Sequence, residues 1–499
     1  MGINDNVYDG TENYFMEVKR GTINGVSAVN KYGRAVDGVQ TTATDIWDLA
    51  NSTPTQQIWL APTAARIHAI VSSSATDTAP VGTLTVTETT ATLTDGDTVL
   101  IDGKTYTFNN TVDNTVDGSV NIASAQATSV LTLAANASNG DTCTIKGRAY
   151  TFQTTLTDTD DNIHIGSDAE ATIDNLVGAI TLTSGTAGTD YAASQTVNAD
   201  YTAVKTTAGS MTITAYASGT GANADGTTET GAQMSWNNAT CVGGTNDASG
   251  SIDNLIAAIN LSGGSEYSSI TTAPEVTMTA TAGAGDTLVL YTTTAVSSTE
   301  TGANMAWGGA VTVASAGANL VKVWGLKTWD TAETSETIML QGTDAVNTVN
   351  SYVIIHRMKI VANGATNVNV GAVKATAASD ATITAQINVG EGQTQMAIYG
   401  VPSTKKAYVK RLWGSTIDAN AGSDVELKLL QNTCPNVQTT QFITKRNFGL
   451  KGAGTSGENT YFEIPLAMDG PCILKIQGTG DNVDMDTSAE FDLILFDNA

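Results

Sequence analysis

The chain has 499 residues and a formal net charge of −26 at pH 7, with 14% charged, 6% aromatic and 41% hydrophobic residues. This apolar content excludes a wholly disordered chain, and the length suffices for roughly three or four domains. A strongly acidic surface repels phosphates, so the composition argues against a protein that binds nucleic acid.

The first segment, residues 1–45, has weak hydrophobic periodicity and many Gly, Asn and Asp residues. We expect it to be an extended N-terminal arm with little core of its own. In a protein that assembles, such an arm docks on a neighbour; the alternative is a loosely ordered tail. The polar start has no apolar run of a signal peptide, and no run of about 18 apolar residues occurs, so neither secretion nor a membrane span is predicted.

Short alternating runs separated by turn residues mark the rest of the chain outside its middle, as in residues 351–360 and 472–476. This spacing is typical of antiparallel sandwiches. We therefore predict a mainly β protein with two antiparallel, jelly-roll-like β-sandwich domains. The first comprises residues 46–80 plus 318–390, and the second residues 391–499.

The middle of the chain carries two copies of one unit. An opening, a central stretch and an ending each occur twice, at residues 97–108 and 141–152, 172–180 and 251–259, and 228–236 and 299–307. The order along the chain is opening, opening, centre, ending, centre, ending. The simplest explanation is an intact unit at 130–250, inserted into a host unit split between 81–129 and 251–317. Insertions of this kind are tolerated at exposed loop tips and are typical of modular surface proteins.

Each copy is predicted to be a small α+β unit. Asp102-Gly103 between two β-rich runs indicates a hairpin. In residues 251–260, the apolar side chains of Ile252, Leu255 and Ile259 recur at helical spacing, and Ser251 is the predicted N-cap. The helix would then complete the unit that the hairpin begins, far upstream in the sequence.

Charge is distributed unevenly between these regions. Residues 81–317 contain 23 acidic and 4 basic residues, whereas the rest of the chain contains 26 and 19. The repeats thus form an acidic lobe on a milder base, and a solvated surface without a specific partner is the alternative. The four cysteines form no CxxC pair, which predicts free thiols and folding in a reducing cytoplasm.

No catalytic motif appears around the three histidines, so we expect no catalytic residue, no enzymatic activity and no bound cofactor. A divalent cation is the one ligand with candidate residues, because dense carboxylates supply the oxygens that Ca²⁺ binds. The candidates lie in two acidic clusters: Asp158, Asp160, Asp161, Asp484 and Asp486. A solvated acidic turn is the alternative at both places.

The opening motif G-D-T-V-x-I-x-G-K-x-Y-x-F and the ending T-E-T-G-A-x-x-x-W resemble a module of tailed-bacteriophage structural proteins. Residues 30–34 and 45–48 resemble the start of a phage virion protein, most similar to capsid decoration proteins or head fibres. The resemblance implies a non-enzymatic virion protein on the capsid surface, folded in the host cytoplasm. Its partners would be the major capsid protein or other virion proteins, and it would form a homo-oligomer such as a trimer, with no membrane or nucleic-acid partner.

Two other functions stay open on the sequence. The first is a tail, collar or fibre component that binds the host surface or another tail protein. The second is a virion-borne glycan hydrolase, in which Asp158, Asp160, Asp161 and Asp484 would carry the activity.

Overall fold

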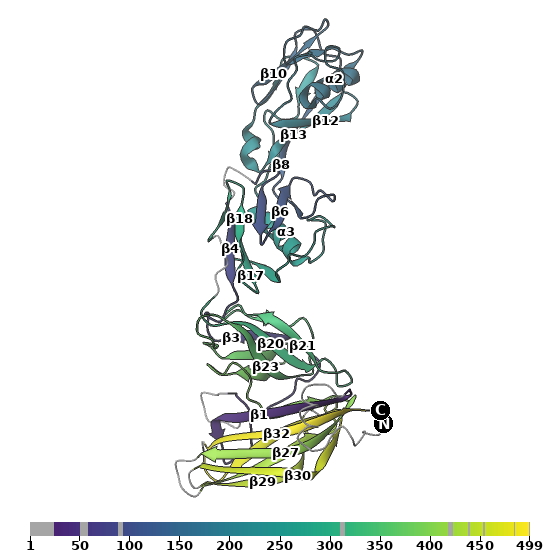
Figure 1. The fold of residues 1–499 in the computed structure, drawn as a ribbon. Helices are drawn as coiled ribbons and strands as arrows, with labels where there is room; N and C mark the ends of the chain where they lie inside the picture. The colour runs from purple at the N-terminus through teal and green to yellow at the C-terminus, as the bar shows by residue number, and fades with distance from the viewer. Residues whose placement is uncertain are drawn as a thin grey trace. The chain divides into compact units, whose positions relative to one another are not determined.

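The computed structural model describes residues 24–49, 58–87, 93–309, 315–417, 423–437, 440–452, 455–483 and 485–498. Strands account for 50% of the structure and helices for 7%, which confirms the predicted mainly β fold class. The chain forms two compact units (Figure 1). We call Met1–Pro80 together with Ala314–Ala499 the base, and Val81–Val313 the insert.

The base contains two sandwich-like halves with separate apolar cores. The N-terminal half has a sheet of order β21-β20-β23 and a sheet of order β22-β3-β24-β25. Their strands are β3 (His68–Ser72), β20 (Ala318–Leu326), β21 (Thr334–Met339), β22 (Val346–Asn347), β23 (Ile354–Asn363), β24 (Val373–Ala377) and β25 (Ile383–Ile387). Trp59 and Tyr352 are fully buried in this core.

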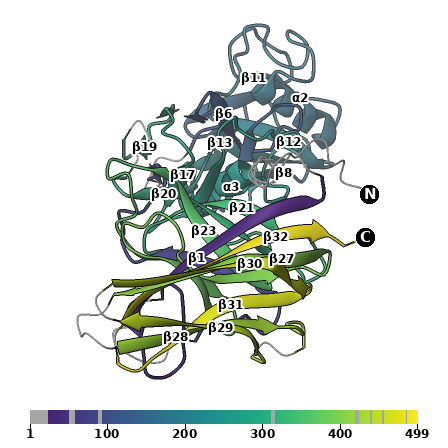
Figure 2. The ribbon, with the colours of Figure 1, turned by 60° about the horizontal axis from the view of Figure 1, so that its bottom comes forward.

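The C-terminal half has a sheet of order β1-β32-β27-β30 (Figure 2). Its second sheet has the order β2-β31-β28-β29, with β26 also pairing with β31. Its strands are β1 (Val26–Val39), β2 (Thr44–Asp45), β26 (Ile398–Val401), β27 (Lys405–Ile417), β28 (Ser423–Asn432), β29 (Ile443–Gly452), β30 (Thr455–Asp469), β31 (Cys472–Gly480) and β32 (Met485–Asp497).

The described part of the predicted arm, residues 24–45, differs from the expectation. β1 pairs with β32 in an antiparallel ladder from Val26↔Phe496 to Val39↔Met485. Ala35, Val39 and Ile46 belong to the C-terminal core. Alternate residues of β1 are buried, and the periodicity is weak because polar Lys31 and Gly33 occupy inward positions. Residues 1–23 lie outside the described part of the chain.

The insert consists of two units of one design, and in its described residues each unit has two four-stranded sheets and one α-helix. In the outer unit the sheet orders are β16-β17-β4-β19 and β18-β5-β6-β7. Its elements are β4 (Val81–Val86), β5 (Thr98–Ile101), β6 (Lys104–Asn109), β7 (Ser119–Asn121), α3 (Ala248–Asn260), β16 (Met278–Ala282), β17 (Thr287–Thr292), β18 (Ser298–Glu300) and β19 (Met305–Trp307).

In the nested unit the orders are β12-β13-β8-β15 and β11-β10-β9-β14. Its elements are β8 (Gln126–Leu133), β9 (Thr142–Ile145), β10 (Arg148–Gln153), β11 (Asn162–His164), α2 (Ala169–Thr181), β12 (Tyr201–Thr207), β13 (Ser210–Ser218), the 3₁₀ helix η1 (Thr220–Ala224), β14 (Thr227–Glu229) and β15 (Met234–Trp236). Both hairpins have left-handed central residues at their turns, Asp102-Gly103 and Lys146-Gly147, as two-residue hairpins require.

One unit lies inside the other in sequence, and each has its own core. The outer core joins Val99 and Ile101 with Leu255 and Ile259, across the whole of the nested unit. The nested core is formed by residues between Ala127 and Cys241. The junction is at Ala125 and Thr245, whose backbones form an isolated β-bridge.

The expected junctions at residues 130 and 250 are therefore displaced by a few residues. β8 begins at Gln126 and belongs to the nested core, while α3 begins at Ala248 in the outer unit. The predicted N-cap, Ser251, is wrong: Asp247 caps the helix, and its carboxylate accepts from the backbone N–H of Gly250 at 2.8 Å. Ser251 is instead buried, with its hydroxyl accepting from the N–H of Ala123 at 3.0 Å.

The insert leaves and rejoins the base at adjacent positions. The Ser315 hydroxyl donates to the carbonyls of Thr76 and Thr78, at 2.6 Å each. Asp77 is fully buried, and its carboxylate accepts from the N–H groups of Ala318 and Gly371 at 2.8 and 2.7 Å. The base is thus closed by its own hydrogen bonds at the point where the insert begins.

The four cysteines are free thiols, as expected, with Cys434 exposed and the other three buried. Among the described residues, no helix has the length and apolar character that crossing a membrane requires.

Candidate functional site

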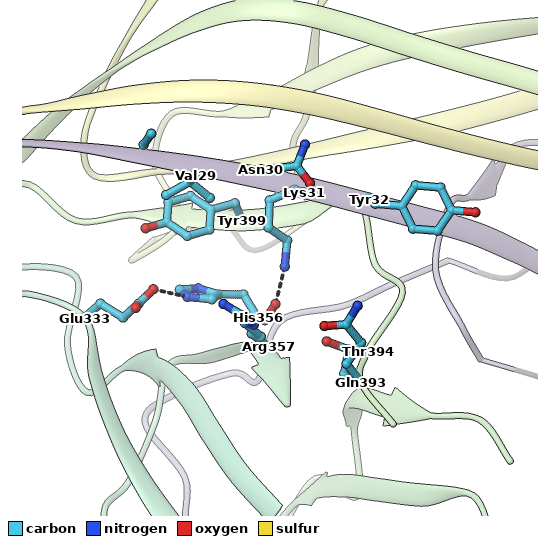
Figure 3. A pocket seen from close by; sticks show the side chains of 11 residues that line it. Val29, Asn30, Lys31, Tyr32, Glu333, His356, Arg357, Gln393, Thr394 and Tyr399 are labelled. Carbon is cyan, nitrogen blue, oxygen red and sulfur yellow. Dashed lines mark hydrogen bonds and ion pairs between the residues drawn. The ribbon is translucent and has the colours of Figure 1, made fainter. Parts of the chain in front are cut away.

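One cavity of the base lies between β1 and the N-terminal half, with a volume of about 370 Å³ (Figure 3). It is lined by Ala28, Val29, Asn30, Lys31, Tyr32, Glu333, His356, Arg357, Gln393, Thr394 and Tyr399. Five of these side chains are ionisable and interact electrostatically with one another: Lys31, Glu333, His356, Arg357 and Tyr399.

Lys31 enters the cavity from an inward position of β1 and is only 7% exposed. Its ammonium donates to the backbone carbonyl of His356, as Figure 3 shows. Burial is the main reason that the pKa of Lys31 falls to about 7, and the positive charge of Arg357 lowers it further. Glu333 and Asp48 oppose that shift. The charge on this amine therefore changes near neutral pH.

His356 lies on β23 and connects the other groups. Its Nε2 is 2.6 Å from a carboxylate oxygen of Glu333, and its ring centroid is 4.4 Å from that of Tyr399. Burial lowers the pKa of His356, although Glu333 opposes the shift. Burial would raise the pKa of Glu333, but the hydrogen bond and charge of His356 outweigh it and lower that pKa. Burial and the Glu333 carboxylate raise the pKa of the Tyr399 hydroxyl.

This arrangement places an imidazole, a carboxylate and a titratable amine beside one another. Its clearest physical effect is to fasten β1 to the N-terminal half through polar contacts. A second buried polar contact of the base is the ion pair between Asp45 of β2 and Lys475 of the neighbouring strand β31, at 2.6 Å, in which both side chains are almost completely buried. The same carboxylate of Asp45 also accepts from the backbone N–H of Trp59 at 2.7 Å.

The sequence analysis did not single out Lys31, Glu333 or Tyr399. One feature of the sequence did point to Lys31. In a strand it falls on the same face as Gly33 and Ala35, which are small residues suited to a buried position. No local pattern marks Glu333, which lies 23 residues from His356 in the sequence. Its role depends on how the strands assemble.

The predicted cation ligands of the insert are engaged in other interactions. Asp160 and Asp161 form ion pairs with Arg148, at 3.4 and 2.7 Å. Asp158 accepts from the backbone N–H of Ser194 at 2.7 Å. Asp160 also accepts from the backbone N–H of Thr196 at 2.9 Å.

Asp486, in the base, forms an ion pair with Arg34 at 3.1 Å, and Asp484 lies outside the described residues. Within the part of the chain that the structure describes, no group of three or more His, Cys, Asp or Glu side chains is placed to hold a metal ion. The described carboxylates therefore serve as partners of arginines and of backbone N–H groups.

The basic side chains of the insert are all engaged in ion pairs, and its acidic side chains are in large excess. All four of its basic side chains form ion pairs within the insert: Lys104 with Asp117, Lys146 with Asp200 and Asp225, Arg148 with Asp160 and Asp161, and Lys205 with Glu170 and Asp174. The remaining carboxylates dominate its electrostatic field.

Comparisons with known proteins give no identification. No protein-family model, no curated protein and no solved structure matches this chain.

Proposed function

We propose that this chain is a non-enzymatic structural protein of a tailed-bacteriophage particle, in which the base attaches to the capsid exterior and the insert projects as an acidic module. One observation carries the proposal: each of the two insertions begins and ends at adjacent, hydrogen-bonded positions. Modules added in this way leave the supporting fold complete, as display on a surface requires.

The distribution of charge also supports attachment through the base and projection of the insert. The base has 26 acidic and 19 basic residues, so it can offer both signs to a protein partner. The insert has 23 acidic residues, and its few basic groups are already paired. Like charge disfavours contact with DNA and between neighbouring inserts, which favours an outward-facing position.

The partner of the base would be the major capsid protein or another virion protein, and the chain would act as a symmetric homo-oligomer such as a trimer. A tail, collar or fibre component is the second candidate. The modular insertions favour it as well, because they would present a surface to the host in the same way.

Copy number per particle separates these two candidates. We would quantify the chain in purified virions by mass spectrometry against the major capsid protein. One copy per capsid subunit, or per few subunits, is expected for capsid decoration. On the order of a dozen copies would assign it to the collar or tail. Absence from purified particles in stoichiometric amount would overturn the proposal.

A binding experiment tests which unit attaches. Residues 81–313 are replaced by a short Gly-Ser linker, and the resulting base is mixed with capsids that lack the chain. The base alone should co-sediment with capsids as the full chain does, and the isolated insert should not. Binding by the insert would reverse the proposed orientation.

A further inference from the structure

The sheet β21-β20-β23 of the base has a basic outward face (Figure 1). Along β20 and β23, buried apolar residues alternate with Lys322, Trp324, Arg357 and Lys359, which point away from the core. Arg357 and Lys359 are exposed to solvent. The strand register sets Lys359 directly opposite Lys322, and Arg357 directly opposite Trp324. Three cations therefore surround one tryptophan on a single face.

The tryptophan is held between two of these cations. Lys322 Nζ lies 5.1 Å from the ring centroid of Trp324, and Arg357 Cζ lies 4.9 Å from it. The attraction between a cation and the face of an indole ring keeps these side chains in one arrangement. Tryptophan and arginine are also the residues that most often dominate the binding energy of protein interfaces.

The two facing lysines are unfavourable for the fold itself, because like charges directly opposite each other destabilise a sheet. The three strands contain one acidic residue, Glu336, which lies on the inward face and accepts from the hydroxyl of Tyr352 at 2.7 Å. Glu333 interacts with Arg357, but its carboxylate is 2.6 Å from Nε2 of His356. The strands of this sheet thus supply no carboxylate to the lysine pair.

The other large sheet of the base treats its cations differently. In the sheet β1-β32-β27-β30, Arg411 directly faces Asp492, and their side chains are 2.8 Å apart. Lys406 directly faces Asp469, at 2.9 Å. Cross-strand cations in this chain can therefore be matched with carboxylates. The facing lysines of β20 and β23 break that pattern, which is expected where a surface serves binding at some cost to stability.

We propose that this face is the surface through which the base binds the capsid, and that its partner is an acidic surface of a capsid protein. The assignment rests on the function proposed above. Carboxylates of the partner would offset the repulsion between Lys322 and Lys359, and Trp324 would be covered at the centre of the contact. DNA is the less suitable anion, because a chain with a net charge of −26 repels a continuous line of phosphates.

The substitution Lys359→Glu separates binding from folding. It turns the facing lysines into an opposite-charge pair, so the variant should be as stable as the wild type or slightly more stable in urea denaturation. Full-length chains are then titrated onto empty capsids that lack the chain, and binding is measured by co-sedimentation. Lys359→Glu should bind about tenfold more weakly than the wild type. The control Lys445→Glu makes the same charge change at an exposed residue of β29 and should stay within about twofold.

The outcomes distinguish this assignment from the function on which it rests. If the wild type does not bind capsids, the proposed function fails and the assignment fails with it. If the wild type binds and Lys359→Glu binds equally well, only the assignment is overturned. Loss of stability together with binding in Lys359→Glu would also overturn it, because the lysine would then serve the fold.

Two further measurements test for other partners of the same face. Sedimentation velocity of the wild type without capsids would detect self-association, and titration with a short DNA duplex would detect binding to phosphates. Either interaction, if present in the wild type and lost in Lys359→Glu, would overturn the assignment in favour of a second copy of the chain or of nucleic acid. We expect neither.

Discussion

The base and the insert hold their polar groups in different ways. The base buries charged side chains, including Lys31, Asp45, Asp48, Asp77 and Lys475. Among the described residues of the insert, every buried polar side chain is a neutral Ser, Thr, Asn or Gln. The base uses its buried charges to join segments far apart in sequence, as Asp45 and Lys475 do across 430 residues. The buried polar side chains of the insert carry no charge, so a unit can be duplicated or moved without leaving a buried charge unpaired.

The strongest test of this difference between the base and the insert is to remove the nested unit entirely. Residues 126–244 are replaced by Asn-Gly, which joins Ala125 and Thr245 at their existing bridge. The outer unit and the base should fold, because Asp247 and α3 are retained. Calorimetry should show an unfolding enthalpy smaller by about 80 kcal/mol near 60 °C, at about 0.7 kcal/mol per residue. Loss of the whole transition of the outer unit would show that its core needs the nested unit.

Breaking a buried ion pair in the base should have the largest effect of any single substitution considered. Lys475→Met leaves the Asp45 carboxylate buried without its ammonium partner, which costs about 3–5 kcal/mol of unfolding free energy. The matched change in the insert is Lys146→Met, which removes the ion pairs of a largely solvated lysine with Asp200 at 3.2 Å and Asp225 at 3.5 Å and should cost about 0–1 kcal/mol. Urea denaturation followed by circular dichroism would measure both.

A double substitution separates charge from packing at this site. Asp45→Asn with Lys475→Met removes both charges and keeps an oxygen to accept from the N–H of Trp59. It should recover most of the stability lost in Lys475→Met, because no unpaired charge is left buried. If the double variant is as unstable as the single one, the aliphatic packing of Lys475 matters more than its charge.

The sequence predicted the elements whose signals are local and missed those that depend on distant partners. The hairpin at Asp102-Gly103 and the helix around Leu255 follow from turn chemistry and spacing, and both occur. β1 was expected to be an arm because the inward Lys31 interrupts its apolar alternation, and only the distant His356 carbonyl explains that lysine. The candidate cation ligands show the same limit of a sequence pattern: the carboxylate clusters were visible in the sequence, but the arginine partners of Asp160, Asp161 and Asp486 were not.

Titration of Lys31 gives a further difference between the two units. The pKa of Lys31 is about 7 in the folded chain and near 10.5 when unfolded, so between these values the unfolded state binds more protons and stability rises with pH. From pH 7 to 9.5 the wild type should gain up to about 3 kcal/mol relative to Lys31→Met. Urea denaturation of both proteins at several pH values would measure it.

The control for this pH dependence is Lys205→Met in the insert. Its ion pairs with Glu170 and Asp174 raise the pKa of Lys205 above its ordinary value, so it stays charged in both states across this window. The difference between wild type and Lys205→Met should therefore be flat from pH 7 to 9.5. A flat difference for Lys31→Met as well would mean that its amine is hydrated in the folded protein.

The smallest predicted effect on stability concerns the helix N-caps in the two copies of the repeat. Asp168 caps α2 and Asp247 caps α3, accepting from backbone N–H groups at 2.9 and 2.8 Å. Replacing either by Ala should cost about 1 kcal/mol, whereas exposed Asp253→Ala in mid-helix should stay within about 0.5 kcal/mol. Thermal melts would compare all three.

The ratio of the two capping effects tests how independent the units are. Asp168 lies within the nested unit, but Asp247 stands at the junction, where its backbone N–H donates to the Ser124 hydroxyl at 2.9 Å. Equal costs would mean that the outer helix is stabilised as if no unit had been inserted before it. A clearly larger cost for Asp247→Ala would mean that the cap also holds the junction closed, so that the outer unit tolerates its insertion because this residue fixes both chain ends.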